Sequence, residues 1–260
     1  MAGRQTIERC RLVPDVDQLP DAATLGRYGR VYLGNEYCEW RLPSASDVAR
    51  VLGTGTPVTL LTPLATRVGL RRIEARVGAA TAGGAPCEVV ANDFGVLEML
   101  RGRPGVTVIA GRLLTRNFVE FADGTLTFTA LASFDFLADR YAVTRYELSN
   151  FHRKLVPGIA PELAARLRLS LYYPYQHVAI TRQCLFRFRD VPADRRVDQV
   201  GCDQSCRDRQ FRFEYPGKVR EPFYVKGNTM FVCFDDFPYD AGELRGLGVD
   251  RLVHSVDLPL

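Results

Sequence analysis

The chain has 260 residues, of which 47% are hydrophobic and 25% charged, a composition that excludes a disordered protein and allows a large core. Its net charge is +4, and residues 181–226 hold eleven Lys and Arg against seven Asp and Glu, so the excess lies there. Such an excess suits either a solvated surface or an anionic ligand such as RNA. Because no apolar stretch has the length of a signal peptide or a membrane span, we expect a cytoplasmic protein.

Short apolar strands alternate with amphipathic helices over the first 150 residues. One helix is predicted to begin after Ser44, whose hydroxyl can cap its first turn, and to end at Gly55. Strand, helix, strand is the order typical of a parallel sheet with crossovers. The sequence predicts strands at 30–34, 58–63, 87–93 and 106–111, and helices at 44–55, 69–84 and 94–102.

The second half is predicted to contain an antiparallel insertion. Strand-like runs lie at 140–148 and 170–181, with helical or capping segments at 149–156 and 160–169. Hairpin strands are predicted at 209–215, 221–227 and 229–237, because Gly227-Asn228 is a tight-turn dipeptide, and a helix and strand follow at 240–248 and 250–258. The most economical fold is α/β: one TIM-like (β/α) barrel domain over 1–260, its closure left open, with a cysteine-rich segment and β insertion at 181–234.

Four of the seven cysteines are candidate metal ligands. Cys202 and Cys206 stand four apart among charged residues, which is unusual for thiols that only pack. Cys38 and Cys184 each follow a predicted strand, and the carboxyl ends of barrel strands carry chemistry. Zinc and iron–sulfur clusters both suit such a thiolate set. The others are predicted to be packing residues, the first of them near a mobile terminus: Cys10, Cys87 and Cys233.

Four segments resemble, in this order, the collagenase-like peptidases of unassigned catalytic type, family thirty-two, which are iron–sulfur barrel proteins: "VYLGNEYCEWR", "CEVVANDFGVL", "RYELSNFH" and "AITRQCLFRFRD…GCDQSCR". The nearest branch is the smaller protein of a pair that supports oxygen-independent hydroxylation in ubiquinone biosynthesis. The resemblance implies a [4Fe–4S] cluster as the metal site of Cys38, Cys184, Cys202 and Cys206. It also implies a homologous iron–sulfur protein as heterodimer partner and a small-molecule or lipid quinone precursor as substrate.

True peptidase activity is not expected, because the chain has neither a G-x-S-x-G elbow nor an H-E-x-x-H zinc motif. Each of the three histidines is predicted to be a surface or satisfied core residue: His152, His177 and His254. In RNA-hydroxylating branches of the family a second cysteine stands seven residues before the one matching Cys184, whereas this chain has His177 there.

The resemblance further implies prephenate as oxygen donor, a dicarboxylate that an arginine fork can bind. Arg145, on a predicted strand with Glu147 on the same face, is the candidate catalytic or binding residue, and an ion pair inside the barrel is the alternative. Asn92 and Asp93 end another strand, where they are either pocket groups or the cap of the next helix.

Two alternative functions stay open. An RNA (tRNA or rRNA) hydroxylation protein would explain why Phe211, Phe213 and Tyr215 alternate with Arg209 and Arg212, although a β-hairpin explains this alternation equally well. A purely structural metal site, with zinc or a cluster, would fasten the insertion to the barrel.

Overall fold

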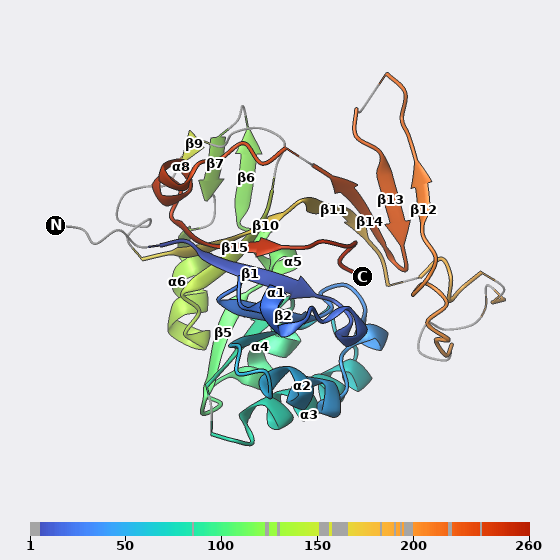
Figure 1. Ribbon diagram of the computed structural model, residues 1–260, viewed down its shortest axis with the longest axis horizontal. Helices are drawn as coiled ribbons and strands as arrows, with labels where there is room; N and C mark the ends of the chain where they lie inside the picture. Colours follow the sequence, from blue (N-terminus) through green and yellow to red (C-terminus); the bar gives the residue numbers. More distant parts are fainter. Residues whose placement is uncertain are drawn as a thin grey trace.

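The protein is a closed barrel of eight parallel strands in the order β1-β15-β10-β8-β5-β4-β3-β2 (Figure 1). The computed structural model describes residues 6–84, 86–122, 125–128, 131–150, 156–157, 166–182, 184–189, 191–192, 194, 200–217, 220–234 and 236–260. The barrel strands are β1 (Glu8–Val13), β2 (Arg30–Gly34), β3 (Val58–Leu61), β4 (Cys87–Ala91), β5 (Val106–Ala110), β8 (Arg145–Ser149), β10 (Arg168–Tyr173) and β15 (Val249–His254). The predicted TIM-like α/β fold is therefore confirmed, and the barrel is complete.

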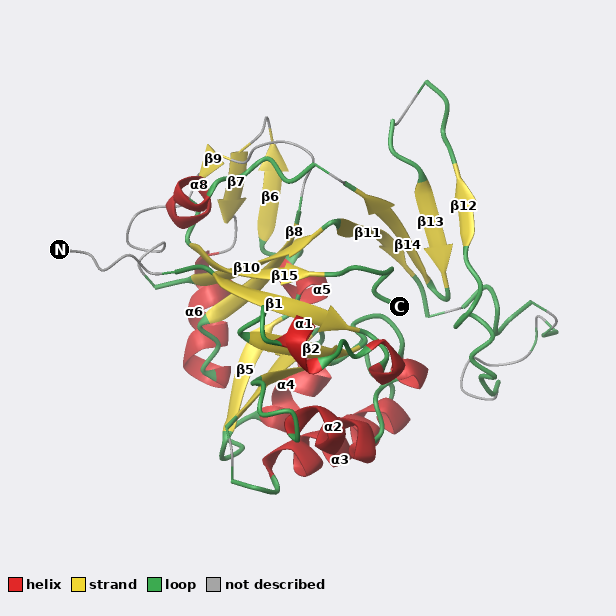
Figure 2. Ribbon diagram, in the orientation of Figure 1, coloured by secondary structure: helices red, strands yellow, loops and turns green. Residues whose placement is uncertain are grey.

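Helices cover the outside of the barrel (Figure 2). They are η1 (Val16–Gln18), α1 (Ala22–Leu25), η2 (Glu39–Arg41), α2 (Ala45–Leu52), α3 (Arg67–Thr81), α4 (Phe94–Leu100), α5 (Arg112–Thr115), α6 (Leu131–Tyr141) and α8 (Ala241–Gly246). The cap predicted at Ser44 is present as a capping box, since its hydroxyl accepts from the backbone of Asp47 and the Asp47 carboxylate accepts from the Ser44 backbone. Buried apolar residues of strands and helices form one large core between the two layers.

Both apolar and charged side chains fill the interior of the barrel. Its apolar part consists of alternating strand residues that point inward: Cys10, Leu12, Tyr32, Leu61, Val90, Ile109, Tyr172 and Val253. Near the amino-terminal end of the barrel Arg251 contacts Glu8 at 2.7 Å and Glu88 at 2.8 Å. Charges can be buried there because they are paired and hydrogen-bonded.

An antiparallel sheet, in the order β11-β14-β13-β12, is inserted between β10 and β15 and projects beside the barrel (Figure 1). Its strands are β11 (Tyr175–Ile180), β12 (Phe211–Phe213), β13 (Phe223–Lys226) and β14 (Thr229–Cys233). The predicted two-residue turn is present: Gly227, at φ +58°, and Asn228 join β13 to β14, with Lys226 paired to Thr229. A third sheet contains β6 (Val119–Ala122), β7 (Thr125–Phe128) and β9 (Val156–Pro157), none of which the sequence predicted as strands.

Three predictions about local structure need correction. Contrary to the prediction, Cys10 does not lie near a mobile terminus: it belongs to β1, which closes the barrel between β2 and β15, and it is fully buried. Strand β8 begins at Arg145, because Arg140 and Tyr141 still belong to α6. Of the segments predicted as helical or capping, 151–155 and 158–165 lie outside the described residues, whereas Val156 lies in β9 and Arg168 in β10.

Within the described part of the chain, no helix is both long and apolar enough to cross a membrane.

Candidate metal centre

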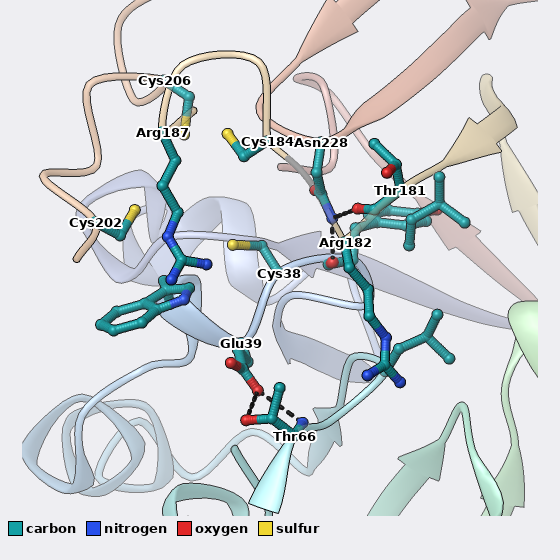
Figure 3. Close-up of a pocket in the computed structure, with 14 residues that line it drawn as sticks. Cys38, Glu39, Thr66, Thr181, Arg182, Cys184, Arg187, Cys202, Cys206 and Asn228 are labelled. Carbon is teal, nitrogen blue, oxygen red and sulfur yellow. Dashed lines mark hydrogen bonds between the residues drawn. The ribbon is translucent and has the colours of Figure 1, made fainter. Parts of the chain in front are cut away.

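A cavity of about 540 Å³ lies at the carboxyl end of the barrel strands, against the base of the inserted sheet (Figure 3). All four candidate ligands, Cys38, Cys184, Cys202 and Cys206, line it. The remaining lining residues are Tyr37, Glu39, Trp40, Leu64, Thr66, Ile180, Thr181, Arg182, Arg187 and Asn228. Segments far apart in the chain thus bring four thiols to the end of the barrel where enzymes of this fold place their chemistry.

Cys38 is positioned by a turn that directly follows β2. Gly34 ends this strand at φ +109°, a conformation that favours glycine. A side chain at this position would place its Cβ 3.2 Å from the Leu61 carbonyl oxygen. The Asn35 side chain then accepts hydrogen bonds from the backbone of Tyr37 at 2.9 Å and of Cys38 at 2.8 Å. The chain turns at Asn35, so that the Cys38 side chain lines the cavity.

The loop with Cys202 and Cys206 is fastened to the rest of the site by two side chains. Arg187, three residues after Cys184, donates from Nε to the Val200 carbonyl at 2.9 Å and lies 4.9 Å from the Trp40 ring centroid. Gln204, at φ +57°, donates to the Trp40 carbonyl at 3.0 Å. The cysteine segments are therefore held together by hydrogen bonds and a cation–π contact rather than by the thiols alone.

The thiols are in unequal electrostatic environments. A hydrogen bond from Cys206 lowers the pKa of the Cys184 thiol, whereas the same bond raises the pKa of Cys206. Desolvation raises the pKa of Cys38 to about 11 and also raises that of Cys202. The hydrogen bond between these two thiols therefore favours the thiolate of Cys184 over that of Cys206.

Two buried donors close to Cys38 in the chain lack partners: neither Trp40 Nε1 nor Arg41 Nη1 has a hydrogen-bond partner among the described residues, and Trp40 lines the cavity. Four thiols in one cavity are the ligand set of an iron–sulfur cluster, so the residues present fit such a group. In the described ranges, however, no three Cys, His, Asp or Glu side chains are placed to hold a single metal ion.

The candidate residues outside the cysteine set lie elsewhere. Arg145 stands at the amino-terminal end of β8, away from the cavity, and its guanidinium contacts both carboxylate oxygens of Asp250, at 2.6 and 3.1 Å. This is the ion-pair alternative that the sequence left open. Glu147 is fully buried in the barrel and accepts a hydrogen bond from the Tyr172 hydroxyl at 2.6 Å. Burial, together with the charge of Glu36, raises the pKa of Glu147 to about 8.

Asn92 and Asp93 connect neighbouring loops at the carboxyl end of the barrel. Asp93 caps α4, as one of the two alternatives predicted, with Oδ1 accepting from Val96 N at 2.8 Å. The Asn92 amide donates to the Thr62 carbonyl at 2.7 Å and accepts from Leu113 N at 3.0 Å. Both polar ends of the buried Asn92 side chain are thus satisfied within the fold.

The histidines differ from one another. His254 is half-buried and has partners, since its ring stacks on Tyr173 at 4.7 Å and hydrogen-bonds the Tyr28 hydroxyl at 3.2 Å. His177 is buried, but neither ring nitrogen has a hydrogen-bond partner in the described part of the chain, so the prediction is wrong for this residue. Burial lowers the pKa of His177 to about 3, and the ring is therefore neutral. His152 lies outside the described residues.

Sequence reasoning missed a buried ion pair beside the cavity. Arg112 begins α5 and contacts Glu36, with Nε 3.1 Å from Oε2, and it also donates to the Tyr37 hydroxyl and to Ser149 Oγ. Its guanidinium carbon lies 3.9 Å from the Tyr172 ring centroid. Glu36 and Arg112 are 76 positions apart, so no local pattern could have paired them.

Phe211 and Phe213 do not share a face of β12 with Arg212, which lies opposite Tyr224. Phe211 stacks on Phe186 at 5.4 Å and Phe213 stacks on Phe223 at 5.3 Å, on one face of the sheet. Arg212 points to the other face, as alternation in a strand requires, and pairs with Glu214 at 2.7 Å. The hairpin alternative that the sequence left open therefore describes this segment.

No family model and no curated protein matches the chain. A solved structure, that of the U32 peptidase Mk0906, is similar to it with a TM-score of 0.46 and 11% sequence identity, over 98% of this chain and 94% of that one.

Proposed function

We propose that the chain is an iron–sulfur protein in which Cys38, Cys184, Cys202 and Cys206 hold a [4Fe–4S] cluster. The observation that carries this proposal is that these four cysteines, from three separate segments, line one cavity at the carboxyl end of the barrel. Each thiol would supply one thiolate ligand. When bound, such a cluster supplies one-electron redox chemistry.

The reaction we propose is an oxygen-independent hydroxylation in ubiquinone biosynthesis, carried out together with a homologous iron–sulfur partner. The sequence motifs resemble those of proteins with this role. Leu64, Ile180 and Tyr37 give the cavity an apolar wall beside the thiols, which suits the ring of a quinone precursor. The protein's own part in the reaction would be to hold the ring against this wall and to exclude bulk water.

Arg182 is the side chain best placed to bind a carboxylate such as that of prephenate. It lines the cavity and, unlike Arg145, forms no ion pair or hydrogen bond with another described residue. A free guanidinium at the wall of an apolar cavity can bind a carboxylate through two parallel hydrogen bonds. Arg182 therefore replaces Arg145 as our candidate for this role.

The first test is anaerobic purification, followed by measurement of absorption near 400 nm and of iron and acid-labile sulfide per chain. We expect about four of each, and their loss in alanine variants of Cys38, Cys184, Cys202 and Cys206 but not in Cys233→Ala, which serves as the control. Zinc in place of iron would overturn the redox function and leave a structural metal. A chain without metal would overturn the proposal altogether.

Binding of the donor can be followed separately, because Trp40 is the single tryptophan of the chain and lines the cavity. Prephenate should change Trp40 fluorescence in the wild type, and Arg182→Gln should weaken binding at least tenfold, whereas the exposed control Arg209→Gln should not. Equal binding by the wild type and Arg182→Gln would remove Arg182 from this role.

A further inference from the structure

The outer strand of the inserted sheet has a free edge. On one side β12 (Phe211–Phe213) is paired with β13, and no strand in the described part of the chain pairs with its other side. Figure 1 shows β12 as the strand of this sheet farthest from the barrel. The outward backbone N–H and C=O groups of an edge strand have no partners within the sheet, so they can pair with a strand of another chain.

The side chains along this edge alternate between an aromatic face and a charged face. The rings of Phe213 and Tyr215 lie on one face, with centroids 6.1 Å apart, so the alternation continues beyond the last residue of β12. On the other face Arg212 and Glu214 form an exposed ion pair at 2.7 Å. Phe211 and Tyr215 are 55% and 57% exposed, so the rest of the chain leaves much of the aromatic face in contact with water.

The segment from Phe211 to Tyr215 is complementary to a second copy of itself. In an antiparallel pair with a two-fold axis opposite Phe213, Arg212 of each chain lies opposite Glu214 of the other. Phe211 of each chain likewise lies opposite Tyr215 of the other, and the two copies of Phe213 meet at the axis. Opposite charges and aromatic pairs that face each other directly both stabilise antiparallel strands.

The charges also select the register of this pairing. A two-fold axis perpendicular to the sheet keeps every side chain on its own face, so the axis must lie opposite one residue of the strand. An axis opposite Arg212 would place two copies of this arginine against each other, and an axis opposite Glu214 would do the same with two carboxylates. Only the axis opposite Phe213 brings the two opposite charges together.

We infer that two copies of this chain associate through the free edge of β12, antiparallel and with the two-fold axis opposite Phe213. The four strands of the inserted sheet in each chain then form one continuous sheet across the dimer. Edge strands of monomeric proteins are commonly protected by charges that repel another strand, whereas the two charges on this edge are of opposite sign. The inference goes beyond the proposed function and involves none of the four cavity cysteines.

The test uses two charge reversals, Arg212→Glu and Glu214→Arg. In a dimer of either variant alone, like charges would face each other at both positions, so the dimer should be weaker. In a mixture of the two variants, one chain has two carboxylates and the other two guanidinium groups, so every facing pair is attractive again. Arg71→Glu, at an exposed position of α3, is the control for a change of net charge.

Sedimentation velocity over a range of protein concentrations at low salt measures the dimer dissociation constant. We expect a concentration-dependent dimer of the wild type and an equal one of Arg71→Glu. Each edge variant alone should dimerise at least tenfold more weakly, and the mixture should form a heterodimer of about wild-type affinity. Mixing separates association from folding, because each edge variant also loses its internal ion pair between positions 212 and 214, which mixing cannot restore.

A wild-type chain that stays monomeric at every concentration, or a dimer that both charge reversals leave intact, would overturn the inference. A mixture that associates no better than either variant alone would also overturn it, because the register would then be wrong. Assembly of the wild type only with a different protein would mean that a second copy is not the occupant of this edge. All these outcomes leave the iron content unchanged, so the proposed function is tested separately.

Discussion

The guanidinium of Arg187 lies 4.9 Å from the ring centroid of Trp40, and its Nε donates to the Val200 carbonyl at 2.9 Å. One side chain thus connects the turn after Cys184 with the loop that begins at Gly201. A cation–π contact and charge-assisted hydrogen bonds of this kind contribute roughly 2–4 kcal/mol together.

The first prediction concerns Arg187→Gln. Without the stack and the charge, the loop holding Cys202 should detach more easily, and the holoprotein should lose its metal to a chelator at least tenfold faster than the wild type. The rate can be followed by absorption near 400 nm. Arg209→Gln, at an exposed position in the same region, should lose metal at the wild-type rate. If both variants behave alike, the Arg187 contacts do not stabilise the loop.

The Arg112–Glu36 pair yields a prediction about stability. Both side chains are buried, so Arg112→Met or Glu36→Gln alone leaves one charge or its hydrogen bonds unpaired and should cost about 3–5 kcal/mol. The double variant should be more stable than either single variant, because it buries no unpaired charge. Urea unfolding of the four proteins measures this coupling. Additive losses would mean that the two residues act independently.

The raised pKa of Glu147 leads to a prediction about how stability depends on pH. Burial raises its pKa to about 8 in the folded state, above its usual value, so the folded protein holds a proton that the unfolded chain has released. The stability associated with this group is therefore complete at low pH and decreases as pH rises from about 4.5 towards 8. The melting temperature of Glu147→Gln, measured as its difference from that of the wild type, should therefore be higher at pH 8 than at pH 5. An equal difference at both pH values would contradict the raised pKa.

Gly227 and Gly217 form a matched pair for mutation to alanine. Both have positive φ, +58° and +74°, so each alanine incurs a backbone cost of about 1–2 kcal/mol. A Cβ at Gly227 would in addition lie 2.4 Å from Leu260 Cδ2, whereas none of the described atoms lies within 4 Å of one at Gly217. Gly227→Ala should therefore destabilise the protein clearly more than Gly217→Ala. Equal losses in urea unfolding would show that Leu260 moves aside freely.

Local patterns in the sequence were enough to predict most elements of the fold. The cap at Ser44 and the turn at Gly227-Asn228 depend on residues within a few positions of each other, and both predictions were confirmed. Strand β1 was missed because its segment, "ERCRLV", has three charged residues among six, and one of them, Glu8, finds its ion-pair partner in Arg251, 243 positions away.

The site was predictable to a lesser extent for the same reason. The grouping of four cysteines came from strand ends and from a family resemblance, whereas the buried pair of Arg112 and Glu36 joins residues 76 positions apart, which no local pattern connects. Arg145 and Arg182 likewise look equivalent in the sequence until Asp250 is found beside the first of them.

The pairing of β1 with β15 also determines the order of events during synthesis. Because β15 (Val249–His254) follows every other barrel strand in the sequence, the barrel cannot close on the ribosome until residue 254 has emerged. Cys206, the last of the four cavity thiols, precedes β15 in the chain and is therefore made before the barrel is complete. A nascent chain thus passes through a stage in which every cavity thiol exists but the barrel is still open between β1 and β10.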